Sequence, residues 1–274
     1  SEEQFYRARF IEEYKIEKKE IFHIPLDIRF KAVSNTRFSI NGYPCLYLSD
    51  SVHTCWVELD KINLDFMHVS QFEFTERHNL LNLCISDLRF MIENFESCKN
   101  GYNKEIITWP LAFVSSVMVK DRTNKSYPEY IIPQLILQWV KQDKCTFKGI
   151  KYLSTKMCDD KIFHLNNNTA FNIVLPLKKI SISSDFTLEK DKYCSNLVDL
   201  LLFTDPFCLK HLEMLRPVEY EKANKRVNEE LIYDATSWKQ TYNNSKFKVL
   251  ERYLNLIEKG RLNLSTKNQI ISEH

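Results

Sequence analysis

Three side chains of different chemistry follow one another at short spacing near the start of the chain: Arg37, Tyr47 and Glu58. A guanidinium can bind phosphate through two parallel hydrogen bonds, and an aromatic ring can stack on a planar cation. A carboxylate can stabilise positive charge that develops as a bond breaks. These three groups can act together only if the fold brings them to one place.

The segment that contains Arg37 and Tyr47 has the pattern of a β-hairpin. Residues 36–40 and 45–48 each alternate polar and apolar side chains, as half-buried strands do, and Asn41-Gly42 between them is a turn signal. Four apolar side chains are then expected to share the core: Phe38, Ile40, Leu46 and Leu48. Arg37 and Tyr47 are therefore expected together on the opposite face of the hairpin.

A predicted helix follows the hairpin and carries Glu58. Ser49-Asp50 is a capping signal, and the helix is expected to begin at Ser51. Its buried face is defined by residues at helical spacing: Val52, Cys55, Trp56 and Leu59. Glu58 lies roughly 110° from the centre of that face on a helical wheel. It is therefore expected to flank the core and to point into a cleft.

Each of these side chains also has an ordinary structural role. An arginine or tyrosine on a strand and a glutamate late in a helix are usually surface or packing residues, so the pattern alone leaves the function open. A hydrolytic triad of Ser51, His53 and Glu58 is disfavoured, because the chain has no Gly-x-Ser-x-Gly elbow and His53 is expected to point away from the core face.

The composition excludes several classes of protein. Only 4 of the 274 residues are glycine, and their spacing fits neither a Walker loop nor a dinucleotide fingerprint, so side chains would have to hold any nucleotide. The 38 basic and 36 acidic residues are interspersed, which argues against direct binding of nucleic acid. No apolar run approaches the ~18 residues of a membrane span. No leader is seen, so we expect a cytoplasmic protein.

The cysteines and histidines do not form a metal-binding pattern. The 8 cysteines include no Cys-x-x-Cys pair, and Cys208 with His211 has ligand-like spacing but no second pair. We therefore expect reduced thiols and no metal site.

Strand-like and helix-like segments together predict an α+β fold. Strands are expected at 5–9, 67–74, 149–154 and 171–176, and helices at 80–98, after Pro133 and over about 245–259. Gly260 stands where the last helix is expected to stop. The apolar run 106–119 is expected to be buried.

The ordered set of motifs resembles the RES-domain toxins, a family named for Arg, Glu and Ser positions. Arg37, Tyr47 and Glu58 match the family signature, and the segments Thr36–Ser39, Leu46–Ser49 and Trp56–Leu59 match the text around it. Further segments also match in order: Phe5–Arg9, Tyr130–Gln134 with Trp139, Gly149–Ser154 and Asn172–Leu175. The resemblance covers roughly residues 5–177.

The resemblance implies an ADP-ribosyltransferase-like fold with mixed sheets and flanking helices, and an enzyme that consumes NAD as substrate without a metal. It implies that Glu58 stabilises the oxocarbenium-like ribose left when nicotinamide departs, that Tyr47 stacks on the nicotinamide, and that Arg37 binds phosphate. Three further residues are expected to bind NAD: Arg7, Tyr6 and Ser154.

The reaction stays open between hydrolysis and phosphorolysis of the nicotinamide–ribose bond. Transfer of ADP-ribose to a protein is an alternative, and so is a non-catalytic module that binds a nucleotide or a partner. Members of the family usually act as the toxin of a toxin–antitoxin pair, so the resemblance implies a helix-turn-helix antitoxin as partner.

The chain is predicted to have two parts. Residues 1–177 form the RES-like NAD-binding catalytic domain, and residues 178–274 form a connection and a mainly helical C-terminal extension. The extension has no counterpart in the family. It is expected to be an oligomerisation element, a docking surface for a partner or a second small domain.

Overall fold

A computed structural model describes residues 3–13, 16–84, 104–119, 127–157, 170–178, 188–214 and 245–263, together with Phe186 and Tyr242. In this part of the chain the centre is an eight-stranded sheet of order β4-β5-β6-β2-β1-β3-β7, with β8 also paired to β3. Its strands are β1 Phe5–Phe10, β2 Cys45–Ser49, β3 Met67–Phe74, β4 Leu80–Leu83, β5 Gly149–Leu153, β6 Phe171–Pro176, β7 Leu201–Phe203 and β8 Phe207–Cys208. Only β4 and β5 run parallel. The predicted α+β class is confirmed.

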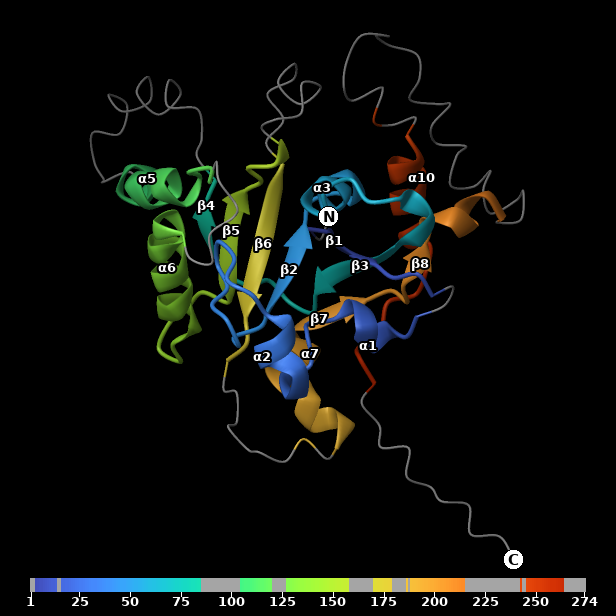
Figure 1. Cartoon of the computed structure of the whole chain (residues 1–274), viewed down its shortest axis with the longest axis horizontal. Coiled ribbons are helices and arrows are strands. Elements are labelled where there is room, and N and C mark those ends of the chain that lie inside the picture. Colours follow the sequence, from blue (N-terminus) through green and yellow to red (C-terminus); the bar gives the residue numbers. More distant parts are fainter. Residues whose placement is uncertain are drawn as a thin grey trace, which may run out of the picture.

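Helices flank both faces of this sheet (Figure 1). They are α1 Lys18–Ile21, α2 Arg29–Ala32, α3 Val52–Glu58, α5 Lys104–Ser115, α6 Ile131–Lys141, α7 Ser195–Leu200 and α10 Lys246–Leu254. On one face, α5 and α6 pack against β4, β5 and β6, while α3 packs against β1 and β2 and is itself covered by α10. Side chains of α1 and α7 pack on the other face.

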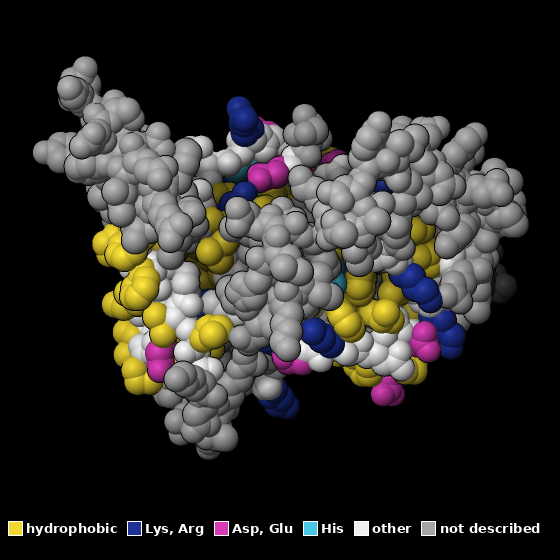
Figure 2. Space-filling model, turned by 90° about the horizontal axis from the view of Figure 1, so that it is seen from above, with side chains coloured by type: hydrophobic (Ala, Val, Ile, Leu, Met, Phe, Trp, Pro, Cys, Tyr) yellow, Lys and Arg dark blue, Asp and Glu magenta, His cyan; other side chains and the backbone are white. Residues whose placement is uncertain are grey.

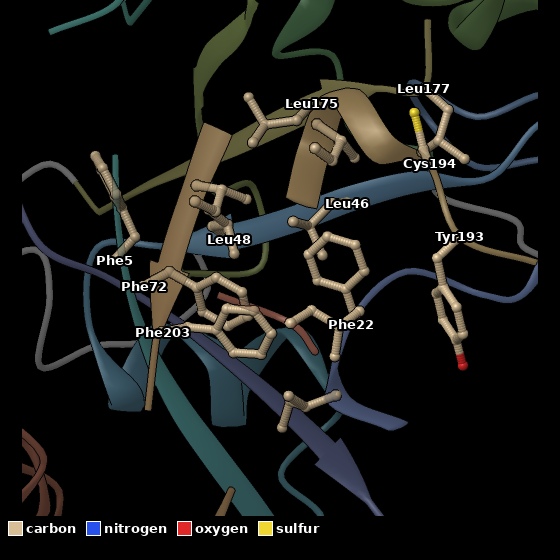
Figure 3. Close-up of a cluster of buried hydrophobic side chains, with 14 of the residues drawn as sticks. Phe5, Phe22, Leu46, Leu48, Phe72, Leu175, Leu177, Tyr193, Cys194 and Phe203 are labelled. Carbon is tan, nitrogen blue, oxygen red and sulfur yellow. The ribbon is translucent and has the colours of Figure 1, made fainter. Parts of the chain in front are cut away.

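The alternation of side chains along β2 divides the core between these two faces. Leu46 and Leu48 join the cluster on the α1 and α7 side (Figure 3). Cys45 and Tyr47 contact the cluster beneath α6. In the first cluster the ring of Phe203 stacks on the ring of Phe72, with centroids 4.4 Å apart.

The sheet separates between β1 and β2. β1 pairs with β3 over its whole length, whereas its register with β2 is a single pair, Tyr6 with Ser49. Figure 1 shows β2 and β1 running in different directions beside α3. The separation leaves part of the inner edge of β2 without a strand partner.

The local predictions around β2 and α3 are confirmed except at His53, which was expected to point away from the core face but is buried, its ring packed against those of Trp56 and Phe247. Ser51 caps α3, because its side chain accepts a hydrogen bond from the backbone N–H of Thr54. Val52 and Cys55 are buried, as expected for the inner face of the helix. Gly42 makes a turn with a positive φ of 79°, and a Cβ there would lie 2.5 Å from the ring of Phe30.

The predicted hairpin is wrong in its first strand. Residues 36–40 form no strand: β6 pairs with β2 along the whole of one edge, and the segment folds back on itself, with the Thr36 N–H donating to the Ser39 carbonyl at 2.9 Å. Phe38 packs in the same cluster as Cys45, and therefore lies on the face of Tyr47 and not on the face of Leu46. The alternation of polar and apolar side chains in residues 36–40 therefore reflects a bent segment that buries individual side chains, such as Phe38, and not a strand.

Three other expectations need correction. Residues 80–83 of the helix predicted at 80–98 form β4, paired with β5, while residues 85–98 lie outside the described residues. The run 106–119 is not buried throughout, since Phe113 is 54% exposed and Met118 is 49% exposed. The last helix ends at Leu254, and Gly260 pairs with Phe203 in an isolated bridge.

The described part of the segment after residue 177 contains the helices α7 and α10 and the strands β7 and β8, and it is tied to the rest of the fold. β7 and β8 extend the sheet beyond β3. Helix α10 packs on α3, and the Glu251 carboxylate accepts a hydrogen bond from the backbone N–H of Val52 at 2.9 Å. The boundary at residue 177 stays a prediction.

Two further features bear on the class of protein. None of the described helices combines the length and apolar character needed to cross a membrane. Six cysteines of the described ranges are free thiols, and no group of three potential metal-ligating side chains occurs in those ranges.

Candidate active site

A row of polar side chains crosses five strands on the face of the sheet that carries α3 and α6. Register pairs place them side by side in this order: Gln71 on β3, Tyr6 on β1, Ser49 on β2, Asn172 on β6 and Tyr152 on β5. Paired residues of neighbouring strands share a face of the sheet. The row therefore forms a polar floor on the face covered by α3.

Glu58, the last residue of α3, is held over this floor. Its Oε1 accepts a hydrogen bond from Ser154 Oγ at 2.6 Å and another from Asn172 Nδ2 at 2.6 Å. Asn172 is fixed in turn by Ser49, whose hydroxyl donates to Asn172 Oδ1 at 2.7 Å. Among the described residues, no hydrogen bond to the second oxygen, Oε2, occurs. The carboxylate is thus held through Oε1, and Oε2 can accept a hydrogen bond from a ligand.

Arg37 reaches the same place from the segment before β2. Its Nη2 donates to Thr155 Oγ1 at 2.7 Å, and Thr155 directly follows Ser154. Its guanidinium also donates to the carbonyls of Ser115 at 2.9 Å and Val117 at 3.4 Å, at the end of α5. The structure therefore brings Arg37, Ser154 and Glu58 together. The guanidinium of Arg37 already donates three hydrogen bonds to other residues of the chain.

Tyr47 lies on the same face of the sheet and is partly buried. Its hydroxyl hydrogen-bonds with Ser39 Oγ at 2.6 Å and with Thr36 Oγ1 at 2.9 Å. Burial is the main reason why the pKa of Tyr47 is raised. The tyrosine thus fixes the segment that carries Arg37, a contact that the sequence pattern did not predict.

Tyr152 and Asn172 are site residues that the sequence reasoning missed. Tyr152 is buried, and its pKa is raised by burial first and then by the nearby Tyr47 and Glu58. Strand alternation could have found Tyr152, because it precedes Ser154 by two residues and shares its face. Asn172 could not be found in this way, since its role depends on the register between β6 and its two neighbours.

Arg7 and Tyr6 lie outside this cluster. Arg7 points to the opposite face of β1 from Tyr6, and it donates to the carbonyls of Ile21 at 2.7 Å and Tyr47 at 2.8 Å. Burial, with a smaller effect of Arg9, lowers its pKa to about 9. Arg7 therefore joins α1 to β2 across the separation in the sheet, and its role in binding NAD stays a prediction.

Tyr6 belongs to the row but lies two strands away from Asn172, which holds Glu58. It is 4% exposed, packs among residues of α3 and α10, and accepts a hydrogen bond from Gln71 Nε2 at 3.1 Å. Burial raises its pKa. Its predicted place in the lining of a nucleotide pocket stays a prediction.

The turn after Glu58 has unusual backbone geometry. Asp60 and Lys61 have φ angles of 58° and 57°, in the left-handed region that side chains other than glycine rarely adopt. Lys156 spans the turn, because its Nζ donates to the Glu58 carbonyl at 2.7 Å and pairs with Asp60 Oδ1 at 2.6 Å. Strain of this kind persists only where neighbouring contacts hold it, and here it lies directly beside the candidate catalytic carboxylate.

Comparisons with known proteins give one relative. The chain is 31% identical over 212 residues to a Bacillus subtilis (strain 168) protein named "Putative toxin YopC". The matched region covers 74% of this chain but 46% of that protein, so the match spans less than half of the length of the relative. No model of a known protein family matches the chain, and no solved structure matches it.

Proposed function

We propose that the chain is a toxin that cleaves the nicotinamide–ribose bond of NAD by hydrolysis or phosphorolysis. The ordered motifs that resemble the RES-domain toxins support the reaction. The name of the Bacillus subtilis relative, "Putative toxin YopC", supports the biological role. The arrangement around Glu58 carries the proposal.

The asymmetric hold on Glu58 suits this reaction. Ser154 and Asn172 both donate to Oε1, so the plane of the carboxylate is fixed while Oε2 accepts no hydrogen bond from the described residues. A carboxylate oxygen held in this way can accept a hydrogen bond from the ribose 2′-hydroxyl and lie beside the anomeric carbon. Its negative charge then stabilises the transition state more than the ground state, where the ribose carries no added charge.

The electron balance of the cleavage is simple. The C1′–N bond breaks, its electron pair leaves with nicotinamide, and the pyridinium charge is lost. An oxocarbenium-like ribose remains beside Glu58 Oε2. Water or phosphate then attacks C1′, which gives ADP-ribose or its 1″-phosphate. The proton of an attacking water passes to solvent or to a nearby base.

Arg37 is proposed to hold a phosphate of NAD. A guanidinium has five N–H donors, and the described contacts of Arg37 use one on Nη1 and two on Nη2. The N–H of Nε and the second N–H of Nη1 have no acceptor among the described residues. Tyr47, whose hydroxyl is anchored by Ser39, is proposed to stack its ring on nicotinamide.

The test is release of nicotinamide from NAD by the purified protein, with and without added phosphate. Wild type should release nicotinamide, and Glu58→Gln and Arg37→Ala should each abolish release. A matched control is Glu76→Gln, because Glu76 has a side chain that is 77% exposed and lies outside the cluster. Release unchanged in Glu58→Gln would refute the assignment of the site.

Labelled NAD separates the alternatives in the same experiment. Label retained on a macromolecule would instead indicate a protein ADP-ribosyltransferase. Binding of NAD without release would indicate a non-catalytic module, once mass spectrometry has excluded a copurified antitoxin. Expression of wild type, but not of Glu58→Gln, should arrest growth if the chain is a toxin.

A further inference from the structure

Helices α5 and α6 are apolar on the side that packs against the sheet and also on the side that faces away from it. The sequence contains no acidic or basic residue from Ile106 to Val119 or from Tyr130 to Val140. The inner side of α6 packs on the sheet through Ile136, Leu137 and Val140. Between Ile131 and Val140 the only polar side chains of α6 are Gln134 and Gln138, and a helix that is apolar on nearly all sides is normally buried on its other side too.

That other side is exposed in this chain. On α6 the exposed side chains are Ile131 at 53%, Ile132 at 38%, Leu135 at 58% and Trp139 at 48%. On α5 and the residues after it they are Leu111 at 39%, Phe113 at 54%, Val117 at 37% and Met118 at 49%. Figure 2 shows hydrophobic side chains gathered along this flank of the molecule. We call this surface the α5–α6 face.

The size of the α5–α6 face is that of an interface. With about 200 Å² for each large apolar side chain when fully exposed, these residues present roughly 800 Å². The largest apolar patch on a monomer is usually about 300–600 Å². An interface of standard size buries about 800 Å² on each partner.

We propose that the α5–α6 face is the contact between two copies of this chain related by a two-fold axis. The face has no charged side chain in the segments named above, so a second identical face meets it without like-charge repulsion. An acidic or basic partner would find no complementary charge there. A two-fold contact requires only that the face be complementary to itself.

The spacing of the exposed residues on α6 meets this requirement. Ile131, Leu135 and Trp139 follow at intervals of four and form one ridge, with Leu135 at its middle and most exposed. Antiparallel packing of two such ridges places Leu135 against Leu135 of the other copy, and Ile131 against its Trp139. Helices commonly pack through ridges of this i±4 kind.

The first experiment is sedimentation equilibrium of the full chain at micromolar concentrations. Wild type should have about twice its chain mass of 32.7 kDa. Leu135→Asp should weaken dimerisation by about a hundredfold or more, because two carboxylates would be buried at the axis. The matched control, Leu256→Asp, changes a leucine that is 62% exposed outside the face and should leave the dimer intact. Circular dichroism of both variants checks that the fold is retained.

A second experiment tests the axis itself. Under mild oxidation Leu135→Cys should form a covalent dimer through that position, whereas Leu256→Cys and wild type should not. A monomeric wild type overturns the proposal, and so does a dimer that persists in Leu135→Asp. A monomer that binds uncharged phospholipid vesicles through Leu135 would also overturn it and would assign the face to a lipid surface.

Discussion

The buried carboxylate of Glu251 accepts a hydrogen bond from the backbone N–H of Val52, 199 positions earlier in the chain, at 2.9 Å. The same oxygen accepts from the hydroxyl of Tyr242, and Oε2 pairs with Lys248 Nζ at 3.2 Å. Val52 is the first residue of α3, and Glu58 is the last. A residue of the C-terminal segment therefore holds the start of the helix whose end bears the candidate catalytic carboxylate.

Replacing Glu251 by alanine should lower the free energy of unfolding by about 2–4 kcal/mol, because two buried donors lose their acceptor. Chemical denaturation measures this loss. Glu251→Gln keeps one acceptor oxygen and should lose less. Lys248→Ala, which removes only the partly exposed ammonium, should have a small effect, and an equally small effect of Glu251→Ala would contradict this view of α10.

Asn172 is a positioning residue for the proposed reaction, since it acts through Glu58. In Asn172→Ala, kcat for nicotinamide release should fall about tenfold or more while KM for NAD changes little, because the carboxylate loses one of its two donors. Asn172→Asp should place a second carboxylate beside Glu58, and the repulsion between like charges should shift the pH profile of its activity toward higher pH. Asn196→Ala removes an exposed amide of α7, outside the polar row, and serves as control. An unchanged pH profile in Asn172→Asp would count against the positioning role.

Lys61 offers a test of the strained turn after Glu58. Its φ of 57° is unfavourable for a residue with a Cβ, and glycine adopts it freely. After the greater freedom of glycine in the unfolded chain is allowed for, Lys61→Gly should raise the free energy of unfolding by roughly 0.5–1 kcal/mol. Thermal unfolding of Lys61→Gly is compared with that of Lys61→Ala. Because alanine keeps the Cβ, the difference between the two variants measures the effect of backbone strain. A gain of the same size in both variants would show that loss of the lysine, and not relief of strain, is responsible.

His23 should make the protein sensitive to acid. Burial, and then the positive charges of Arg7 and Arg9, lower the pKa of His23 to about 4. Its Nε2 accepts from the backbone N–H of Cys194 at 2.9 Å, so a proton on that nitrogen would break the hydrogen bond.

The direction of the pH effect follows from these two states. The unfolded chain binds the proton near pH 6.5 and the folded chain only near pH 4, so the contribution of His23 is complete above about pH 6.5 and is lost as the pH falls through 4. The loss should reach up to about 3 kcal/mol. Urea unfolding from pH 7 to pH 4 should show a shallower decline in His23→Gln than in wild type. Parallel declines in the two proteins would contradict the prediction.

The sequence predicted the elements whose signals are local. The cap at Ser51, the turn at Gly42 and the strand β2 depend on a few neighbouring residues, and each is confirmed. The hairpin prediction is wrong because alternation in residues 36–40 does not reveal that the partner of β2 along its whole length is β6, more than a hundred positions later. The pairing of strands is a property of the whole chain.

The candidate site, too, was predictable only where its residues belong to local motifs. Arg37, Ser154 and Glu58 were identified from their motifs, and the structure brings them together through Thr155 and the Ser154 hydroxyl. Asn172 required the register of three strands. The apolar composition of the run 106–119 predicts burial. Composition alone, however, does not show whether an apolar segment is buried in the core or lies on an exposed apolar face.

Because β3 pairs on its outer edge with β7 and β8, which come much later in the sequence, the order of synthesis matters for this protein. A nascent chain carries β3 with an open edge, and α3 without the cover of α10, until the segment that ends at the Phe203–Gly260 bridge has left the ribosome. Folding of the sheet is therefore expected late in translation. A chain cut short after β6 should expose that edge to chaperones and proteases. The protein with an assembled site should therefore accumulate only from chains that include β7, β8 and α10.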